Sequence, residues 1–194
     1  MKEILFATGN KNKVKEVNLL LDGLYKVITP FDLGITDDVE ETGETFKENA
    51  LLKTQALQKQ TKLSIFSEDT GLLLPALGLR PGVKTARYAG ENATAQDNMS
   101  KLQKELNGKM DRSAYFRTVI CLFWNAEYYY FEGECHGTIS AEQKGGNGFG
   151  YDPLFIPNGY DKTFGELGVD IKKKLSHRAL AINKLVEFLK KEEA

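Results

Sequence analysis

The chain has 194 residues, of which 41% are hydrophobic and 10% aromatic. These values are ordinary for a globular protein and argue against a disordered chain. Lysine and arginine (26 residues) nearly balance aspartate and glutamate (27 residues), so the formal net charge is -1. A protein that binds duplex DNA normally carries a marked basic excess, so polymeric nucleic acid is disfavoured as a partner. A small anionic ligand is compatible with this charge, because local clusters of opposite sign cancel in the total.

The lengths of the apolar runs and the spacing of the cysteines indicate the cellular location that we expect for the protein. No apolar run approaches the roughly 18 residues that a membrane span requires, so no membrane partner is expected. Cys121 and Cys135 have neither metal-type nor disulfide-framework spacing. We expect both to be packing residues of a protein kept in the reducing cytoplasm.

Strand and helix patterns alternate in the first half of the chain. Short apolar runs predict strands at residues 4–7, 25–29 and 63–67, and the last of these delivers Glu68, Asp69 and Thr70 at its end. Amphipathic patterns predict helices at residues 14–21, 45–60 and 94–106. The second of these helices opens with the capping-box pattern, with Thr45 as N-cap and Glu48 three residues on.

The pattern changes in the second half. Residues 114–124 and 127–135 form two strand-like runs around Asn125-Ala126, which predicts a hairpin, and residues 136–142 can add a third strand. A final helix is predicted at residues 176–191, with its apolar positions on one face. Because there is no internal repeat and no low-complexity linker, we expect a single mixed α/β domain over residues 1–194, bent into two lobes with a cleft between them.

The segment ATGNKNK lies where the first strand passes into the first helix. Thr8, Gly9 and Asn10 suit a tight turn, and the backbone N–H groups and positive dipole end of the following helix attract phosphate. Lys11 and Lys13 stand at the helix end where the dipole disfavours cations, a placement that a bound anion would explain. A plain turn with solvated lysines is the alternative, and the Walker P-loop pattern is absent.

Carboxylates gather in two places. Glu68 and Asp69 follow a buried strand, and an acidic stretch precedes the capped helix. That stretch contains Asp37, Asp38, Glu40, Glu41 and Glu44. Carboxylates from separate segments suit a hard divalent cation such as Mg2+, so Glu68 and Asp69 could form one metal group with carboxylates of this stretch. A carboxylate at a strand end can instead orient and deprotonate water, and a solvated acidic loop is the alternative for the first stretch.

The segment GGNGFGYDP has four glycines in six residues, which lets the backbone approach a ligand closely. Phe149 and Tyr151 offer faces for a planar base. The alternative is a glycine-rich loop whose aromatic side chains fold into the core.

The segment KKKLSHR lies at the start of the last predicted helix. Ser176 is a good N-cap, but residues 172–174, His177 and Arg178 add positive charge to the positive end of the helix dipole. A bound anion or an electron-rich carbonyl group would make that arrangement favourable. A basic surface patch is the alternative.

Six segments together resemble a known family. ATGNKNK, EETGETFKENALLK, SEDTGL, PGVKTARYAG, GNGFGYDP and LSHR occur in the order and spacing of the Ham1-like, or RdgB-type, inosine triphosphate pyrophosphatases, and the resemblance runs from about Ile4 to Leu189. The chain departs from the family where many bacterial members read DDSGL, and where Leu79 replaces a glycine. The resemblance implies an elongated, two-lobed α/β fold that has a mixed sheet, flanking helices and a central substrate cleft.

The resemblance also implies an activity. This is the Mg2+-dependent hydrolysis of non-standard purine nucleoside triphosphates (ITP, dITP or XTP) to the monophosphate and pyrophosphate, by a cytoplasmic homodimer that keeps these nucleotides out of DNA and RNA. Asp69 matches the catalytic residue and a metal ligand, and Glu40 or Glu41 matches the second metal carboxylate. The implied substrate contacts are Thr8, Gly9, Asn10, Lys11, Asn12, Lys13, Lys53, Thr70, Phe149, Gly150, Tyr151, Asp152, Lys172, His177 and Arg178.

Two rival hypotheses use the same residues. A nucleotide-binding regulatory module would bind ITP without turnover, and a general nucleoside triphosphatase or phosphatase would release orthophosphate. Donors from Arg178, His177 or loop amides would match the O6 and N7 acceptors of hypoxanthine and xanthine, but would face the amino group of adenine badly. We therefore expect slower turnover of ATP than of ITP. Slower turnover of GTP is also expected, but it requires a group that disfavours the 2-amino group of guanine, and the sequence identifies no such residue.

Overall fold

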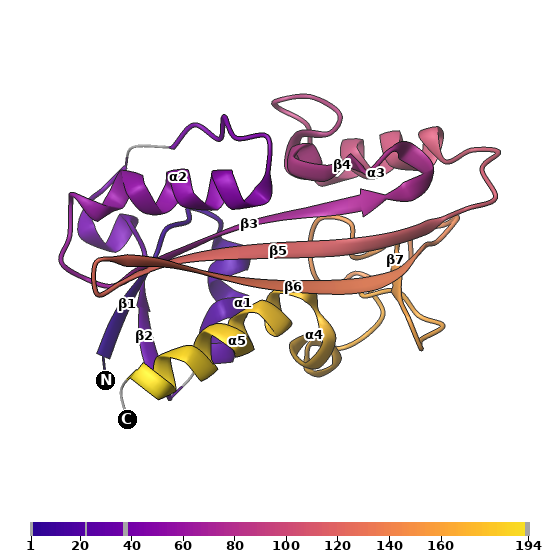
Figure 1. Ribbon diagram of the computed structural model, residues 1–194. Coiled ribbons are helices and arrows are strands. Elements are labelled where there is room, and N and C mark those ends of the chain that lie inside the picture. Colours follow the sequence, from indigo (N-terminus) through magenta and orange to yellow (C-terminus); the bar gives the residue numbers. More distant parts are fainter. Residues whose placement is uncertain (1, 22, 37–38, 193–194) are drawn as a thin grey trace. The chain divides into compact units, whose positions relative to one another are not determined.

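The structure is a computed structural model that describes residues 2–21, 23–36 and 39–192 (Figure 1). Its strands form a mixed sheet in the order β2 (Tyr25–Ile28), β1 (Lys2–Phe6), β3 (Ile65–Leu74), β5 (Ser113–Trp124), β6 (Glu127–Ile139) and β7 (Phe155–Pro157), and β4 (Arg80–Pro81) pairs with β3. β1 pairs in parallel with β2 and β3, whereas the β3–β4 and β6–β7 pairs are antiparallel.

Helices flank this sheet, as expected. They are α1 (Lys11–Leu21), α2 (Phe46–Gln58), α3 (Ala95–Glu105), α4 (Val169–Leu175) and α5 (His177–Glu192), with short 3-10 helices η1 (Phe31–Leu33), η2 (Pro75–Leu77) and η3 (Gly82–Arg87). The mixed α/β fold class is therefore confirmed. Within the described residues, no helix combines the length and the apolar character needed to cross a membrane.

The chain divides into two compact units. The first unit comprises Met1–Asp69, Thr118–Gly133 and Arg178–Ala194, and the second comprises Thr70–Arg117 and Glu134–His177. β3, β5 and β6 each contribute residues to both units. Each unit buries its own hydrophobic core.

The core of the first unit lies on both faces of its part of the sheet. Successive side chains of a strand point to opposite faces, so Ile4 and Phe6 of β1 pack with α1 and α5, whereas Leu5 packs with α2. In β3, Phe66 stacks on Phe6 with ring centroids 4.5 Å apart, and Ile65 joins Leu5 in the other layer. Figure 1 shows α2 on one side of β1 and β3, with α1 and α5 on the other. This alternation decides where the polar side chains of β3 point.

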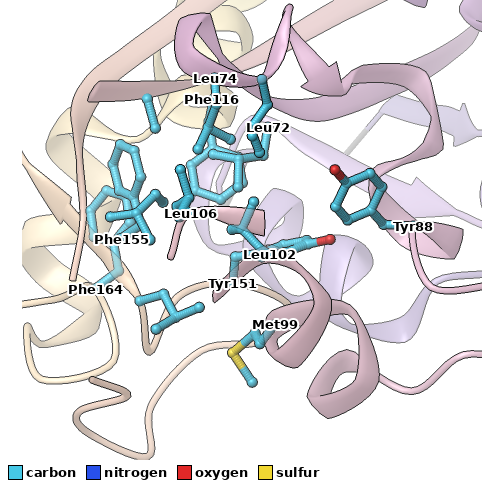
Figure 2. Close-up of a cluster of buried hydrophobic side chains, with 14 of the residues drawn as sticks. Leu72, Leu74, Tyr88, Met99, Leu102, Leu106, Phe116, Tyr151, Phe155 and Phe164 are labelled. Atoms are coloured by element: carbon cyan, nitrogen blue, oxygen red, sulfur yellow. The ribbon is translucent and has the colours of Figure 1, made fainter. Parts of the chain in front are cut away.

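The core of the second unit gathers aromatic and aliphatic side chains from β3, β5, α3 and the segment around β7 (Figure 2). The ring centroid of Phe155 lies 4.8 Å from that of Phe116 and 5.4 Å from that of Phe164. Tyr151 is only 3% exposed and belongs to the same core. Its hydroxyl donates a hydrogen bond to the carbonyl oxygen of Thr85 at 3.0 Å, so the ring is packed and anchored.

Both α2 and α3 begin at a capping box. The Thr45 side chain accepts a hydrogen bond from the N–H of Glu48, whose carboxylate accepts one from the N–H of Thr45. Thr94 and Asp97 make the same pair of bonds at α3. The capping box predicted at Thr45 is confirmed, and it satisfies N–H groups that the start of a helix leaves without intrahelical partners.

The hairpin between β5 and β6 is also confirmed. Asn125 and Ala126 have φ of 48° and 66°, the left-handed backbone that a two-residue hairpin favours. The strand predicted at residues 136–142 is not a separate element, because the buried–exposed alternation of β6 continues without a break to Ile139. The strand that pairs with this end of β6 is β7, which is only three residues long and was not predicted.

β3 is longer than its apolar run predicts. Glu68, Asp69 and Thr70 lie inside the strand and not at its end, because the buried leucines that follow them continue it to Leu74. An unpaired carboxylate is unfavourable in a buried strand, which is why the pattern alone ends the strand before Glu68, at Ser67. The prediction is wrong because both carboxylates have partners from distant segments.

A short helix, α4, precedes α5, where the sequence pattern predicts a single final helix. Ser176 separates the two helices with an extended backbone (φ -67°, ψ 150°). Residues 172–174 therefore lie in the last turn of α4, where the helix dipole favours cations. The dipole argument for a bound anion is wrong for these lysines and holds only for His177 and Arg178, in the first turn of α5.

Candidate active site

The turn between β1 and α1 is closed by Asn10. Its Oδ1 accepts hydrogen bonds from the N–H groups of Asn12 (3.0 Å) and Lys13 (3.3 Å), and its own N–H donates to Thr8 Oγ1 (3.2 Å). Asn10 thus caps α1, which begins at Lys11 and has no acidic residue in its first turn. The positive end of the dipole and two lysine side chains meet here, which is a favourable environment for phosphate.

Glu68 and Asp69 are neighbours in β3, yet they contact opposite faces of the sheet, as the two-residue period of a strand requires. Glu68 shares the face of Phe66 and contacts α1 and α5, whereas Asp69 contacts α2. Both are buried, with 1% and 5% exposure. The prediction that Glu68 and Asp69 belong to one metal group is therefore wrong.

Asp69 is held by two side chains of α2. Asn49 Nδ2 donates to Asp69 Oδ2 at 3.1 Å, and Lys53 Nζ lies 3.6 Å from Asp69 Oδ1. Burial raises the pKa of Asp69, Lys53 opposes that rise, and Glu41 adds to it. The balance keeps the pKa of this carboxyl above its usual range, as suits a group that accepts a proton.

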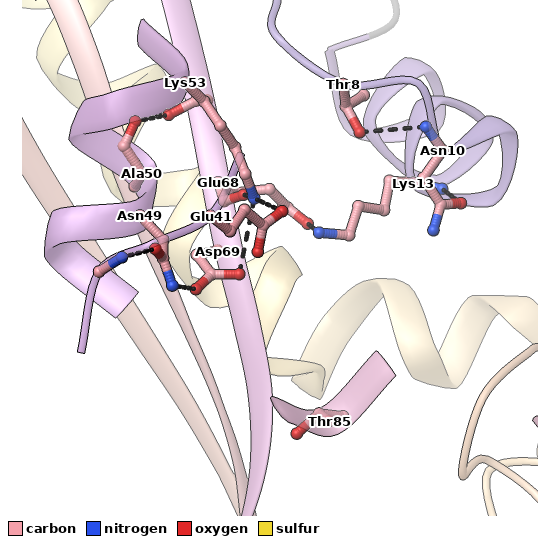
Figure 3. Close-up of polar contacts among 12 residues, drawn as sticks. Thr8, Asn10, Lys13, Glu41, Asn49, Ala50, Lys53, Glu68, Asp69 and Thr85 are labelled. Atoms are coloured by element: carbon pink, nitrogen blue, oxygen red, sulfur yellow. Dashed lines mark hydrogen bonds and ion pairs between the residues drawn. The ribbon is translucent and has the colours of Figure 1, made fainter. Parts of the chain in front are cut away.

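Lys53 brings Glu41 and Asp69 together (Figure 3). Its Nζ lies 2.7 Å from Glu41 Oε1 and donates a hydrogen bond to the backbone carbonyl oxygen of Glu68 at 3.1 Å. The Glu41 side chain is 28% exposed, whereas Glu40 is exposed to solvent. Two carboxylates from separate segments therefore converge on one ammonium group.

The residues of this pair fit Mg2+. Among residues 2–21, 23–36 and 39–192, no three His, Cys, Asp or Glu side chains form a metal-binding group. Mg2+ needs only one or two protein carboxylates, because water and phosphate oxygens supply its other ligands. Glu41 and Asp69 meet that requirement, and they already attract a cation, the Lys53 ammonium. Asp37 and Asp38 of the acidic stretch lie outside the described residues.

Glu68 belongs to a buried ion-pair network on the other face. Arg178 Nε donates to both Glu68 oxygens at 2.9 Å and Nη2 donates to Oε1 at 2.7 Å, while Lys13 Nζ lies 3.2 Å from the same oxygen. Arg178 Nη1 also pairs with Glu16 of α1. Burial alone raises the pKa of Glu68, but Arg178 and Lys13 outweigh it and hold the pKa well below its usual range. The network ties α1 and α5 to β3 and fixes the Lys13 side chain.

The second unit holds a different polar cluster, around Asp152. Asp152 Oδ2 accepts hydrogen bonds from the N–H of Phe149 and from Lys172 Nζ, both at 2.7 Å. Lys172 Nζ also lies 4.9 Å from the centroid of the Phe149 ring. A Cβ at Gly148 would fall 2.1 Å from Asp152 Oδ2, so the loop needs glycine there. A fixed cation beside an aromatic ring suits a planar ligand rich in acceptors.

The other predicted contacts have simpler surroundings. His177 is 4% exposed and its ring stacks on Phe116, with centroids 4.7 Å apart. Thr70 is half-buried next to Asp69 in β3, Gly9 is exposed in the turn before α1, and Gly150 has φ of 63°. The first unit therefore brings together Glu41, Lys53 and Asp69 on one face of β3, and Lys13 and Arg178 around Glu68 on the other face. The second unit brings together Phe149, Asp152 and Lys172.

Asn49 and Glu16 contact predicted site residues but were not themselves predicted. Asn49 could have been identified from the sequence, because it shares the apolar face of α2 with Phe46 and Ala50. A buried amide on such a face needs hydrogen-bond partners, which makes it a candidate for a structural or functional contact. Glu16 lies in α1 between exposed Lys15 and buried Val17 and carries no comparable signal.

Comparisons with known proteins agree on one family. The profile of the Ham1 family matches residues 4–188. Two similar relatives, both named dITP/XTP pyrophosphatase, come from Porphyromonas gingivalis (43% identity over 97% of this chain and 98% of the relative) and Bacillus subtilis (44%, 97% and 98%). The structure of the Staphylococcus aureus Ham1 protein superimposes with a TM-score of 0.89 and 41% identity, covering 98% of this chain and 100% of that one.

Proposed function

Because this chain belongs to the Ham1 family, we propose that it is a nucleoside triphosphate pyrophosphatase that hydrolyses ITP, dITP and XTP to the nucleoside monophosphate and pyrophosphate. The observation that carries the proposal is the convergence of Glu41 and Asp69 on the Lys53 ammonium group. Two carboxylates and a lysine, close to the capped start of α1, make up a set that can bind a metal–triphosphate and activate water.

The triphosphate is proposed to bind at the turn before α1, through residues 8–13 and Lys53. The capped helix start supplies partial positive charge, and Lys13 and Lys53 supply full charges. Glu68 holds Lys13 and Glu41 holds Lys53, so both cations are oriented before a ligand arrives. Phosphoryl transfer depends on such positioning and charge neutralisation more than on covalent help.

Glu41 and Asp69 are the proposed Mg2+ ligands. When bound, Mg2+ supplies neutralisation of the charge that develops on the phosphate oxygens. Glu41 is preferred over Glu40 because its carboxylate, and not that of Glu40, contacts the same ammonium group as Asp69.

Asp69 is also the proposed general base. Its pKa is raised by burial, so the carboxylate has a higher affinity for a proton than an exposed aspartate. Asp69 would orient a water molecule and take its proton as the water oxygen bonds to the α-phosphorus. The bond from the α-phosphorus to the α–β bridging oxygen breaks, and pyrophosphate leaves with that electron pair.

Base recognition is assigned to Phe149, Lys172, His177 and Arg178. Asp152 holds Lys172 beside the Phe149 ring, stacking fixes His177, and carboxylates on two sides fix the Arg178 guanidinium. Rigid donors discriminate strongly, because a base that lacks matching acceptors leaves them unpaired. Hypoxanthine and xanthine offer O6 and N7, whereas adenine presents an amino group at the six position.

We further propose that the enzyme acts in the cytoplasm as a homodimer and keeps non-standard purines out of DNA and RNA. The relatives named dITP/XTP pyrophosphatase support this role. Light scattering coupled to size-exclusion chromatography tests the dimer, and a mass equal to one chain would contradict it.

The deciding experiment measures pyrophosphate and orthophosphate released from ITP, dITP, XTP, ATP and GTP, with and without Mg2+. We expect pyrophosphate alone, far faster from the first three nucleotides and only with the metal. Orthophosphate as the product would indicate a general phosphatase. Saturable ITP binding without any product would indicate a regulatory binding module.

A further inference from the structure

Asn49 is a buried amide whose two ends serve different parts of the candidate site. It lies in α2 with 0% exposure. Its Oδ1 accepts a hydrogen bond from the N–H of Gly43 at 2.8 Å, and its Nδ2 donates to Asp69 Oδ2 at 3.1 Å (Figure 3). A backbone N–H only donates and a carboxylate only accepts, so the orientation of the amide follows from its partners.

The Gly43 contact fixes the loop that carries Glu41. A Cβ at Gly43 would lie 2.7 Å from Asn49 Oδ1 and 2.7 Å from Glu48 Cβ, so a larger residue would separate the loop from α2. Glu48 accepts hydrogen bonds from the N–H groups of Glu44 and Thr45, at 2.9 and 3.0 Å. The loop is therefore held to α2 at successive positions, and the Asn49 bond lies two residues from Glu41.

We infer that Asn49 is a positioning residue that holds Asp69 and the Glu41 loop in register, so that the two carboxylates are oriented together for a divalent cation. A single rigid amide bonded to both segments leaves little freedom for one carboxylate to move relative to the other. The inference rests on the proposed function, because it assigns to Asn49 the support of the proposed metal pair. Asn49 itself touches neither nucleotide nor metal in this scheme.

The test is the variant Asn49→Ala, with Mn2+ as the probe. Loss of a residue that orients metal ligands typically weakens metal affinity or activity by about 10- to 100-fold. We expect that loss in the Mn2+ affinity of the nucleotide-free protein, measured by electron paramagnetic resonance of free Mn2+. In ITP hydrolysis we expect kcat to fall and the half-saturating Mg2+ concentration to rise, while KM for ITP at saturating Mg2+ changes by less than about three-fold.

Two further variants separate positioning from stability. Gly43→Ala leaves the Asn49 amide intact but prevents the close approach, so it should also weaken Mn2+ binding. Asn98→Ala is the matched control, because Asn98 is another buried helix asparagine that pins a loop through both ends of its amide, at Ala89 N (2.7 Å) and Ala86 O (2.9 Å). It should lower the unfolding midpoint like Asn49→Ala without changing Mn2+ affinity.

Unchanged Mn2+ affinity in folded Asn49→Ala would overturn the inference, and so would an equal loss of affinity in Asn98→Ala. If Asn49→Ala does not fold, the Gly43→Ala result decides in the same way. A wild-type protein that binds no Mn2+ would also overturn it, because there would be no metal pair to position. The proposed function fails by a different outcome, namely the absence of pyrophosphate release from wild-type protein.

Discussion

The two units of this protein bury charge in different ways. In the first unit, Glu68 and Asp69 project from opposite faces of one strand, and each is surrounded by charged or amide side chains. In the second unit, Asp152 and Lys172 pair beside aromatic rings. Glu68 loses two cationic partners, Arg178 and Lys13, when its charge is removed, whereas Asp152 loses one, Lys172. Removing the charge of Glu68 should therefore lower the free energy of unfolding more than removing the charge of Asp152.

The largest effect is expected for Asp69→Asn. The amide keeps the shape of the side chain but does not take a proton from water, and a positioned base is typically worth about 100- to 10,000-fold in rate. Pyrophosphate release from ITP should fall by that factor while the unfolding midpoint barely changes. A variant that hydrolyses ITP like the wild type would remove Asp69 from its proposed role.

The next effect is on stability, in Glu68→Gln. The glutamine removes the carboxylate charge that pairs with the buried Arg178 guanidinium, and breaking a buried pair typically lowers the free energy of unfolding by about 3–5 kcal/mol. Urea unfolding measures the loss. As a control, Glu3→Gln breaks the exposed Lys26–Glu3 pair and should leave the urea midpoint unchanged.

A smaller effect is expected in the second unit, for Asp152→Asn. The asparagine oxygen can still accept one hydrogen bond, so the expected loss of unfolding free energy is about 1–3 kcal/mol. KM for ITP should rise, because Lys172 loses the carboxylate that holds it beside Phe149. A stability loss as large as that of Glu68→Gln would abolish the contrast between the two units.

The smallest effect is a difference in acid sensitivity. The pKa of Glu68 is lower in the folded protein than in the unfolded chain, so its stabilising contribution is complete above the ordinary glutamate pKa of about 4.3 and is lost as pH falls below that value. Asp69 has the opposite effect on stability. Because its pKa is raised in the folded protein, its contribution to the free energy of unfolding becomes more favourable as pH falls. Below pH about 4, unfolding free energy should fall with pH less steeply in Glu68→Gln than in the wild type, by up to about 1.4 kcal/mol per pH unit. Equal slopes of unfolding free energy against pH in Glu68→Gln and in the wild type would contradict the lowered pKa of Glu68.

Local signals were enough for much of the fold. The capping box at Thr45 and the Asn125-Ala126 hairpin depend on residues close in the chain, and both are confirmed. Cys121 and Cys135 are buried free thiols, as expected, and burial raises the pKa of Cys135 to about 12. The division between α4 and α5 was missed, because the amphipathic pattern does not show that the backbone at Ser176 is extended.

The candidate site was harder to predict where its contacts are long-range. The segments around Lys13, Lys53 and Asp69 could be recognised because each carries its own motif. The roles of Asn49 and Glu16 could not, since each depends on a partner from another element. The choice between Glu40 and Glu41 also depends on a long-range contact, because Glu41, and not Glu40, contacts Lys53 of α2.

The near-neutral charge of -1 and the six family segments follow from the sequence alone, and they already point to a small nucleotide rather than to a nucleic acid polymer. What the tertiary structure decided is which charges face each other. Arg178 pairs with Glu68, which is 110 positions away in the sequence, and this pairing lets a carboxylate lie inside a buried strand that the sequence pattern ends one residue earlier. Once the strand continues, its two-residue period places Glu68 and Asp69 on opposite faces, one in an ion-pair network and one beside Glu41 and Lys53.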